Sequence, residues 1–457
     1  MIEEIENEKV RVVPSDWRWS ATVVGLEKYL KHYELNYNIH DEYLEFSKSD
    51  IDDEKYLLFA EKHFAENMHH VIVEDLIEVN NPSEDQIKLV NDKLSKNTSS
   101  NSVMNRTFKD VKYDSNNSNA IKEIIEKNRT ELIKQTFKGG RALYYNFCNE
   151  NNMLSESGNS CRLRGYSVDM GKKSKSLAFA RDKNTTVNVD SKYFDFIPFA
   201  FSKTREAFFI NNNFTVQQLI HSNKNDLSNI DDNIRSKLFF KVKNSSAYID
   251  YDVEVIRKDR DSDFYETIFL KKDAISIFEK VEENTLKAIT SPCKINTMFA
   301  DANPGNGNEN WLKTEKIVVD SIINNIKLDF LIDGLLKLGD KNYLISHLIK
   351  INQLIYKEDQ KMTELQKRAY GSAMEVKKIL SGNKSNKLRA YEQRLISAIT
   401  LKDYDRVQEI LLHLSAFTQV QMSFLIELFE DFEKNKNLAY TFINMLGEKK
   451  QIEKKGE

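Results

Sequence analysis

The sequence predicts an α+β fold: a mixed α/β region with antiparallel strands over residues 1–310, followed by an all-α helical bundle over residues 311–457. Three observations predict it. Apolar residues keep helical spacing on one face in the tail, at Leu401, Tyr404, Val407, Ile410, Leu411 and Leu414. Apolar and polar residues alternate from Ala247 to Val255, the period of a half-buried strand. Between the two regions lies DANPGNGNEN (Asp301–Asn310), a Gly/Pro/Asn-rich linker.

The N-terminal region opens with helices. Residues 17–33 form the first, with Ser15 or Asp16 as its cap, and residues 53–78 form one or two more. Residues 97–119 are rich in Ser and Asn without periodicity, which predicts a loose loop. Residues 121–137 are helical again, and Gly139-Gly140 ends that helix.

Strands and the tail complete the expected order of elements. The strand at 247–255 is expected to pair with residues 264–270 across the charged turn KDRDSD. Beyond the linker, apolar stripes fill residues 317–338 and 422–432, and few glycines and no prolines interrupt residues 342–440. We therefore expect an antiparallel bundle.

Composition restricts the class of protein. The 457 residues carry a formal net charge of −3, which argues against a nonspecific nucleic-acid coat but allows nucleic acid held inside a larger assembly. No uninterrupted run of about 18 apolar residues exists, so no membrane span is expected. The start, MIEEIENEK, has no apolar segment typical of a secretory signal. Three cysteines (Cys148, Cys161, Cys293) cannot form a disulfide framework and suit a reducing cytoplasm.

The stretch from Gly158 to Lys183 departs most from this acidic background. It carries a net charge of +5 and three glycines, Gly158, Gly165 and Gly171. Its cations are Arg162, Arg164, Lys172, Lys173, Lys175, Arg181 and Lys183. A cationic segment in which glycine lets the backbone approach closely is typical of a phosphate-binding surface, so we expect DNA-binding residues here. An ordinary solvated face is the alternative.

Two further groups could contact DNA or belong to the fold. Asn211, Asn212 and Asn213 follow an apolar strand. An asparagine amide can donate and accept at a base edge; the alternative is that Asn213 or Thr215 only caps the next helix. Trp17 and Trp19 fit the core of the first helix, with a subunit-docking anchor as the alternative.

Catalytic and metal-binding patterns are weak. The segment GYSVDMGKKS (residues 165–174) differs in register from a phosphate-binding loop of nucleotide hydrolases. Asp252 and Glu254 alternate as nuclease carboxylates would, but Ile256 stands where the lysine should be. The histidine-rich run HFAENMHH, with His63, Glu66, His69 and His70, lacks a third ligand in register. We expect no enzyme activity, no cofactor and no metal.

Three segments together resemble one protein family. Asp16–Leu26 reads DWRWSATVVGL, Tyr193–Asn213 reads YFDFIPFAFSKTREAFFINNN, and Asp252–Phe278 reads DVEVIRKDRDSDFYETIFLKKDAISIF. In this order they resemble the opening, the central strand pair with its Asn-rich turn, and the hairpin with its following helix in the large subunit of type I-B CRISPR Cascade, the CxxC–CxxC branch of the Cas-eight family. The resemblance covers most of the chain.

One departure concerns the zinc site that gives this branch its name. The family has two CxxC pairs, whereas the corresponding region near residues 140–185 holds only Cys148 and Cys161, with no histidine nearby. Two isolated thiols cannot close a tetrahedral site. We expect a degenerate zinc-finger-like insert without zinc.

The resemblance implies a non-enzymatic role inside an RNA-guided antiviral complex in the cytoplasm. Its partners would be the CRISPR guide RNA, target double-stranded DNA, the Cascade backbone subunits and a separate helicase-nuclease. The chain would read the flanking motif, stabilise the R-loop and recruit the helicase-nuclease.

The tail resembles the small Cascade subunit, and the window 361–400, with net charge +6, would line the displaced strand. The candidate residues are Lys367, Arg368, Lys377, Lys378, Lys387 and Arg389. A solvated helix face is the alternative. Two other functions stay open: a metal-dependent nuclease using Asp252 and Glu254, and a helical adaptor for protein partners.

Overall fold

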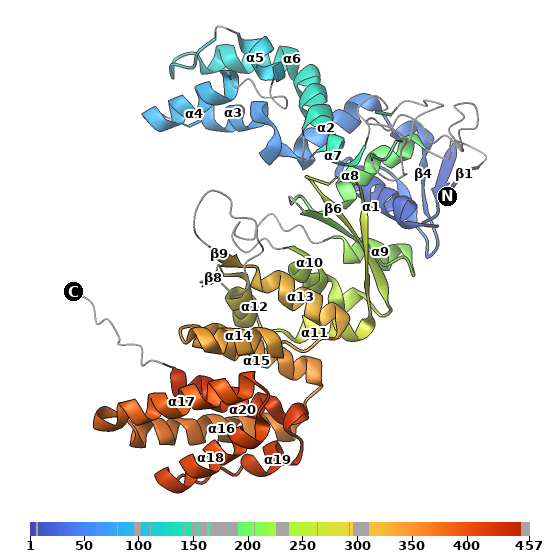
Figure 1. Ribbon diagram of the computed structural model, residues 1–457. Helices are drawn as coiled ribbons and strands as arrows, with labels where there is room; N and C mark the ends of the chain where they lie inside the picture. The colour runs from blue at the N-terminus through green and yellow to red at the C-terminus, as the bar shows by residue number, and fades with distance from the viewer. Residues whose placement is uncertain are drawn as a thin grey trace, which may run out of the picture. The chain divides into compact units, whose positions relative to one another are not determined.

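The computed structural model describes residues 1–5, 8–79, 81–95, 102–109, 111–140, 143–148, 153–154, 162–164, 191–204, 206–224, 237–262, 264–291, 293–295 and 310–448. These residues divide into two compact units. The first holds the described residues up to 224 and those from 240 to 272; the second holds 237–239 and the described residues from 273 onward. The division falls at residue 272, ahead of the linker that the sequence predicts as the border. The fold class is α+β, as predicted (Figure 1).

A four-stranded antiparallel sheet and one buried helix form the centre of the first unit. The sheet has the order β1-β2-β4-β3, and its strands are β1 (Ile2–Ile5), β2 (Lys9–Val12), β3 (Tyr37–Ile39) and β4 (Leu44–Ser47). Helix α1 (Trp17–His32) begins at Asp16, whose carboxylate accepts from the backbone N–H groups of Arg18 and Trp19. The cap and the helix are those that the sequence predicts.

Helix α1 needs a glycine where the chain returns to it. A Cβ at Gly25 would lie 2.0 Å from the carbonyl oxygen of Phe196, so only glycine allows this approach. Phe196 belongs to the 3-10 helix η4 (Lys192–Phe196), which leads into α8 (Ile197–Ala200). Trp19 is buried, with its ring centroid 4.6 Å from that of Phe194. This confirms the predicted core position of Trp19.

The segment 193–213 does not form the strand pair that the family resemblance predicts. It forms η4, α8 and then a single strand, β5 (Glu206–Asn211). Pro198 occupies the first turn of α8, where its missing N–H costs nothing and its fixed φ favours the helix.

A group of helices in the first unit has its own apolar core. They are α3 (His69–Ile77), α4 (Glu84–Ser95), α5 (Ser102–Phe108) and α6 (Ser118–Gly139). Helices α2 (Asp53–His63) and α7 (Tyr144–Phe147) instead bury their apolar residues in the core around α1. Figure 1 shows α3 to α6 side by side. Met104 and Phe108 are buried between α4 and α6, so part of the predicted loop at 97–119 is helical because its apolar residues reach this core.

The second sheet of this unit is antiparallel, with order β5-β6-β7, where β6 is Val253–Asp259 and β7 is Glu266–Leu270. The pairing of β6 with β7 confirms the predicted hairpin. The predicted strand at 247–255 is wrong before Val253, because residues 246–248 form a 3-10 helix, η6 (Ser246–Tyr248). There the Ser246 hydroxyl donates to the carbonyl of Lys243, a local bond that competes with a ladder.

The outer edge of β5 is covered by side chains. The N–H of Ile210 donates to Asn223 Oδ1 (3.0 Å), and Asn223 Nδ2 donates to the carbonyl of Ile210 (2.7 Å). Two residues earlier, the N–H of Phe208 donates to Ser202 Oγ (2.9 Å), and the N–H of Ser202 donates to the carbonyl of Phe208 (3.1 Å). Asn223 follows helix α9 (Val216–Ser222). The Thr215 hydroxyl caps this helix, which is one of the two caps that the sequence suggested.

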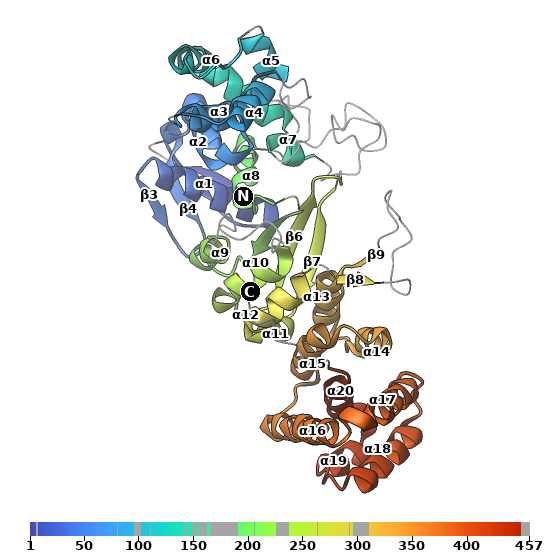
Figure 2. The same ribbon diagram turned by 90° about the vertical axis from the view of Figure 1, so that its left-hand side faces the viewer.

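The second unit is mainly helical, as predicted for the tail (Figure 2). Its helices are α11 (Lys272–Lys280, from Asp273), α12 (Glu283–Thr290), α13 (Thr314–Asn324), α14 (Asp329–Leu338), α15 (Asn342–Tyr356), α16 (Gln360–Ile379), α17 (Ser385–Thr400), α18 (Tyr404–Thr418), α19 (Leu425–Glu430) and α20 (Phe432–Gly447). Strands β8 (Cys293–Ile295) and β9 (Asn310–Leu312) pair antiparallel. Helix α10 (Lys237–Ser245) is divided at residue 239, with its start assigned to the second unit and the rest to the first. Helix α20 packs against α15, α16, α17 and α19.

Among the described helices, none combines the length and the hydropathy needed to cross a membrane.

Candidate nucleic-acid interface

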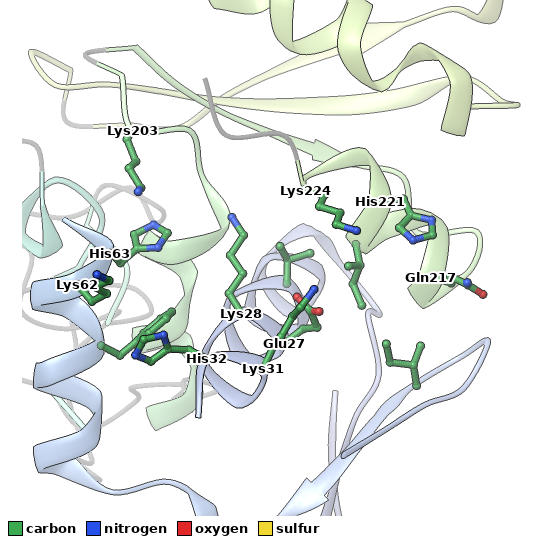
Figure 3. Close-up of a pocket in the computed structure, with 14 residues that line it drawn as sticks. Glu27, Lys28, Lys31, His32, Lys62, His63, Lys203, Gln217, His221 and Lys224 are labelled. Atoms are coloured by element: carbon green, nitrogen blue, oxygen red, sulfur yellow. The ribbon is translucent and has the colours of Figure 1, made fainter. Parts of the chain in front are cut away.

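A basic pocket of about 500 Å³ lies in the first unit (Figure 3). Its lining contains five lysines and three histidines, with Glu27 as the carboxylate among the lining residues. We call this feature the basic pocket; its lining residues are Val24, Glu27, Lys28, Lys31, His32, Ile39, Phe59, Lys62, His63, Lys203, Gln217, Ile220, His221 and Lys224. This balance of charge favours an anionic ligand.

Segments distant in the sequence supply these cations. Helix α1 contributes Lys28, Lys31 and His32, which share one face because they are three and four residues apart. Lys62 and His63 end α2, Lys203 follows α8, and His221 and Lys224 lie on and just after α9. Figure 3 shows the Lys28 and Lys203 side chains extending toward His63.

Lys28 and His63 are half-buried residues of the pocket lining. Lys28 Nζ donates to the carbonyl of Phe199 at 2.9 Å. Burial lowers the pKa of His63 well below its usual value, and the positive charges of Lys28 and Lys203 lower it further. The imidazole is therefore neutral at pH 7. Its Nε2 is buried and has no hydrogen-bond partner among the described residues.

A buried, unpartnered nitrogen normally carries a cost that a ligand or water can relieve. Lys31, Lys62 and Lys224 are exposed and make no ion pair with another described residue. Glu27 is buried and accepts from the Tyr37 hydroxyl at 3.4 Å. The pocket can thus hold phosphate oxygens with several ammonium groups, and His63 can donate to the same anion once it is protonated.

The predicted basic segment lies mostly outside the described residues. Lys172, Lys173, Lys175 and Arg181 all fall there. Arg162 and Arg164 are described. Arg162 is 3% exposed, and its Nη1 lies 2.6 Å from Asp195 Oδ2 in the core, so we leave it out of the DNA-binding surface. Arg164 is half-buried, and its guanidinium lies 3.9 Å from the centre of the Tyr145 ring.

Asp195 makes Arg162 part of the core rather than of a surface. Its carboxylate also accepts from the Tyr144 hydroxyl (2.7 Å) and from the N–H of Leu154. Burial raises the pKa of Asp195, and the charge of Arg162 opposes that rise. Nearby, Cys148 is buried and its thiol donates weakly to the carbonyl of Phe194 (3.9 Å). Cys161, the other residue of the expected insert, lies outside the described residues.

The three asparagines have different environments. Asn212 is buried, and its amide donates to Ser222 Oγ (3.0 Å) and to the carbonyl of Tyr248 (2.7 Å). Asn211 is 8% exposed and donates to Glu254 Oε2 at 3.0 Å. Asn213 is exposed, with its amide 3.4 Å from the carbonyl of Pro14. Asn213 is therefore the member of this run that lies on the surface.

The cations predicted for the displaced strand lie on α16 and α17 in the second unit. Lys367, Arg368, Lys378 and Arg389 are exposed and make no ion pair with another described residue. Lys387 lies over the Phe417 ring at 4.8 Å. Lys377 is half-buried and donates to the carbonyls of Met445 (3.2 Å) and Glu448, so it satisfies the C-terminal end of α20.

The residues considered for metal chemistry do not gather. His70 Nε2 pairs with Glu61 (2.8 Å), and Glu61 also pairs with Arg129 (2.6 Å). Asp252 accepts from the backbone N–H of Lys272, while Glu254 accepts from Asn211. Within the part of the chain that the structure describes, no group of three or more His, Cys, Asp or Glu residues could hold a metal ion.

The sequence pattern does not predict the basic pocket, although it marks one of the lining residues, His63, as a candidate metal ligand. The one local signal was the spacing of Lys28, Lys31 and His32 on the first helix. The remaining cations are too far apart in sequence to form a run.

Comparison with known proteins gives the class of this chain and then its family. A family model described as CRISPR-associated protein Csx8 matches residues 9–233 and 221–446, far more than half of the chain. The chain is therefore a CRISPR-associated protein. It belongs to the family described by the name Csx8. No curated protein and no solved structure matches it.

Family membership agrees with the sequence-based expectation of a CRISPR-associated protein. The type I-B assignment and the CxxC–CxxC branch stay predictions.

Proposed function

We propose that this chain is the DNA-reading large subunit of an RNA-guided antiviral interference complex, of type I-B as the sequence resemblance suggests. In this role it contacts the guide RNA and the backbone subunits, recognises the flanking motif of target double-stranded DNA, stabilises the R-loop and recruits a separate helicase-nuclease. The chain itself does no cutting. Membership of a CRISPR-associated family supports the general role.

The observation that carries the nucleic-acid part of the proposal is the basic pocket. Five lysines converge on one concavity of a chain whose formal net charge is −3. Ammonium groups that face one another repel, so such a cluster is costly unless an anion lies between them. A phosphodiester backbone supplies anions at regular spacing and fixes register without reading sequence.

Two other surfaces belong to the same proposal. The cations of the segment 158–183 other than the buried Arg162 would bind the duplex near the flanking motif, with Asn213 as the candidate for a base-edge contact. The exposed cations of α16 and α17 would line the displaced strand.

The test is charge reversal in the assembled complex. The triple variant Lys31→Glu, Lys62→Glu and Lys224→Glu changes exposed side chains, so folding should be retained. We expect affinity for nucleic acid to fall by ~100-fold or more. The salt dependence should become shallower by ~0.9 in slope for each phosphate that the variant no longer neutralises.

The matched control reverses three exposed lysines of α4 and α6 that do not line the pocket, Lys88, Lys127 and Lys134. This control should keep near-normal affinity. Equal losses in the two triple variants, or no loss in either, would refute the assignment of the pocket.

A further inference from the structure

An exposed aromatic strip adjoins the basic pocket. Its members are Phe214, Tyr248 and Tyr251, which are 63%, 42% and 51% exposed. Large aromatic side chains at the surface of a folded unit expose apolar area that a ligand can cover. Phe214 lies just before α9, and the two tyrosines lie in and just after η6.

Two ring contacts join the same two segments of the chain. The rings of Phe214 and Tyr251 have centroids 4.7 Å apart with an interplanar angle of 31°. The rings of His221 and Tyr248 have centroids 5.2 Å apart with an interplanar angle of 45°. The backbone below is fixed, because Asn212 donates to the carbonyl of Tyr248. The strip is thus held in place and does not depend on a single mobile side chain.

The strip and the pocket are continuous through His221. This histidine lines the pocket together with Gln217 and Lys224, and its ring contacts Tyr248 of the strip. Figure 3 shows His221 and Gln217 on the same helix, with Lys224 beyond its end. A ligand that places an anion against the pocket lining at His221 can therefore also contact the ring of Tyr248.

The charge beside the strip is mixed but balanced. Asp250 Oδ2 lies 3.4 Å from Gln218 Nε2, and its other oxygen lies 3.7 Å from Lys272 Nζ. The Lys272 ammonium also donates to the carbonyl of Ile249. The anion of Asp250 is thus accompanied by a cation, so the strongly charged part of this surface is the pocket.

We propose that the basic pocket and the aromatic strip together bind one stretch of single-stranded nucleic acid, with phosphates in the pocket and bases stacked on the strip. The inference rests on the proposed function of the pocket as a backbone site. Cationic groups beside exposed aromatic faces match the phosphates and the bases of a single strand. A duplex buries its bases in the stack and could use the lysines alone.

The experiment measures binding of the full-length chain to labelled strands of about ten nucleotides. One strand is oligothymidine, the second is an abasic strand with the same number of phosphates, and the third is a duplex of equal length. An oligouridine strand is added because a guide RNA and an opened DNA strand present the same chemistry. The ratio of the affinity for each base-bearing single strand to the affinity for the abasic strand isolates the contribution of the bases.

We expect oligothymidine or oligouridine to bind ~10-fold or more tightly than the abasic strand. The double variant Phe214→Ala and Tyr251→Ala should remove this preference and leave the salt dependence unchanged. The control, Phe264→Ala and Phe269→Ala, removes two rings of the same unit that are 56% and 69% exposed and lie outside the strip. It should retain the preference. Whichever of the RNA and DNA strands shows the larger base contribution identifies the source of the ligand.

Equal affinity of the wild-type chain for base-bearing and abasic strands would overturn the inference. A preference retained in the double variant would overturn it too. If that variant also fails to join the other subunits, the strip is a protein-docking surface. Failure of the proposed function is distinguishable, because the triple lysine variant would then bind all strands as the wild type does.

Discussion

The cations of the two units are arranged differently. In the first unit, Lys28, Lys62 and Lys203 come from separate parts of the sequence and converge on one concavity. In the second unit, Lys367, Lys378 and Arg389 lie within one short stretch, on the exposed sides of two consecutive helices. Cations that surround a cavity raise the local electrostatic potential more than cations that are only close in sequence, because field lines concentrate in a cavity. We therefore expect the pocket to contribute more affinity per charge than the bundle.

The largest effect should come from breaking the buried ion pair of Arg162 and Asp195. Asp195→Ala leaves the buried guanidinium of Arg162 without its carboxylate, which we expect to lower the free energy of unfolding of the first unit by ~3–5 kcal/mol. Urea denaturation followed by circular dichroism measures the loss. Glu78→Ala removes the exposed pair with Lys122 and should cost less than ~1 kcal/mol. Similar losses in the two variants would contradict the structural role of Arg162.

The next effect compares two glycine substitutions, one in each unit, which should change stability in opposite directions. Gly25→Ala forces a methyl group against the carbonyl of Phe196 and should destabilise by ~1–3 kcal/mol, displacing the helix that carries Lys28 and Lys31. Gly371→Ala in α16 meets nothing within 4 Å and should stabilise the bundle by about 0.5–1 kcal/mol. Thermal unfolding and nucleic-acid affinity are the measurements. A harmless Gly25→Ala would show that α1 and η4 are not held as described.

The bundle has a buried acid whose titration should be visible in its stability. Burial raises the pKa of Glu358 to about 7, opposed by a hydrogen bond from Asn437. The folded state then keeps a proton that the unfolded state loses near pH 4.5, so the free energy of unfolding should fall as pH rises from about 4.5 to 7. We expect a loss of ~2 kcal/mol over this range. Glu358→Gln should flatten the profile, and an unchanged slope would exclude Glu358 as its source.

Charge reversal in the bundle tests the comparison directly. Lys367→Glu, Arg368→Glu and Lys378→Glu should weaken binding of target DNA to the assembled complex by ~10-fold, less than the equivalent triple variant of the pocket. The measurement is affinity over a range of salt concentrations. A larger loss from the bundle variant would reverse our ranking of the two surfaces.

The smallest effect concerns His63. Its pKa lies below the usual value because it is buried and faces Lys28 and Lys203; Lys62, His32 and the carboxylate of Glu27 also line the pocket. A bound phosphate would raise this pKa, so binding takes up a proton and affinity should increase by ~3-fold as pH falls from 8 to 6. His63→Gln should reduce that increase, whereas His32→Gln serves as the control on the pocket rim. An identical pH profile in His63→Gln would place the anion elsewhere.

Local signals in the sequence predicted much of the fold. Asp16 caps α1 as expected, and β6 pairs with β7 across the charged turn. The errors came from residues whose partners are remote. The apolar alternation before Val253 reflects burial of Ile249 beside a 3-10 helix, and Phe108 makes a helix because it reaches the core of α4 and α6. In both cases burial depends on residues that are not neighbours in the sequence.

The candidate site was harder to predict for the same reason. A run of charge is visible in the sequence, so a basic surface could be predicted for residues 158–183 and for residues 361–400. A convergence of single lysines, such as Lys62, Lys203 and Lys224, becomes visible only when the chain is folded. Arg162 shows the opposite error. It belongs to a basic run in the sequence, but in the fold it pairs with the buried carboxylate of Asp195 and leaves the surface.

The covered margin of β5 limits how this protein can meet its neighbours. The amide of Asn223 acts toward Ile210 as a peptide group of an adjacent strand would, and Ser202 does the same for Phe208. An incoming extended segment would find these two sites already occupied, so the sheet cannot be prolonged there by augmentation without first displacing native groups. A partner that meets the chain at β5 should therefore contact side chains and leave the backbone groups of Phe208 and Ile210 with their present partners.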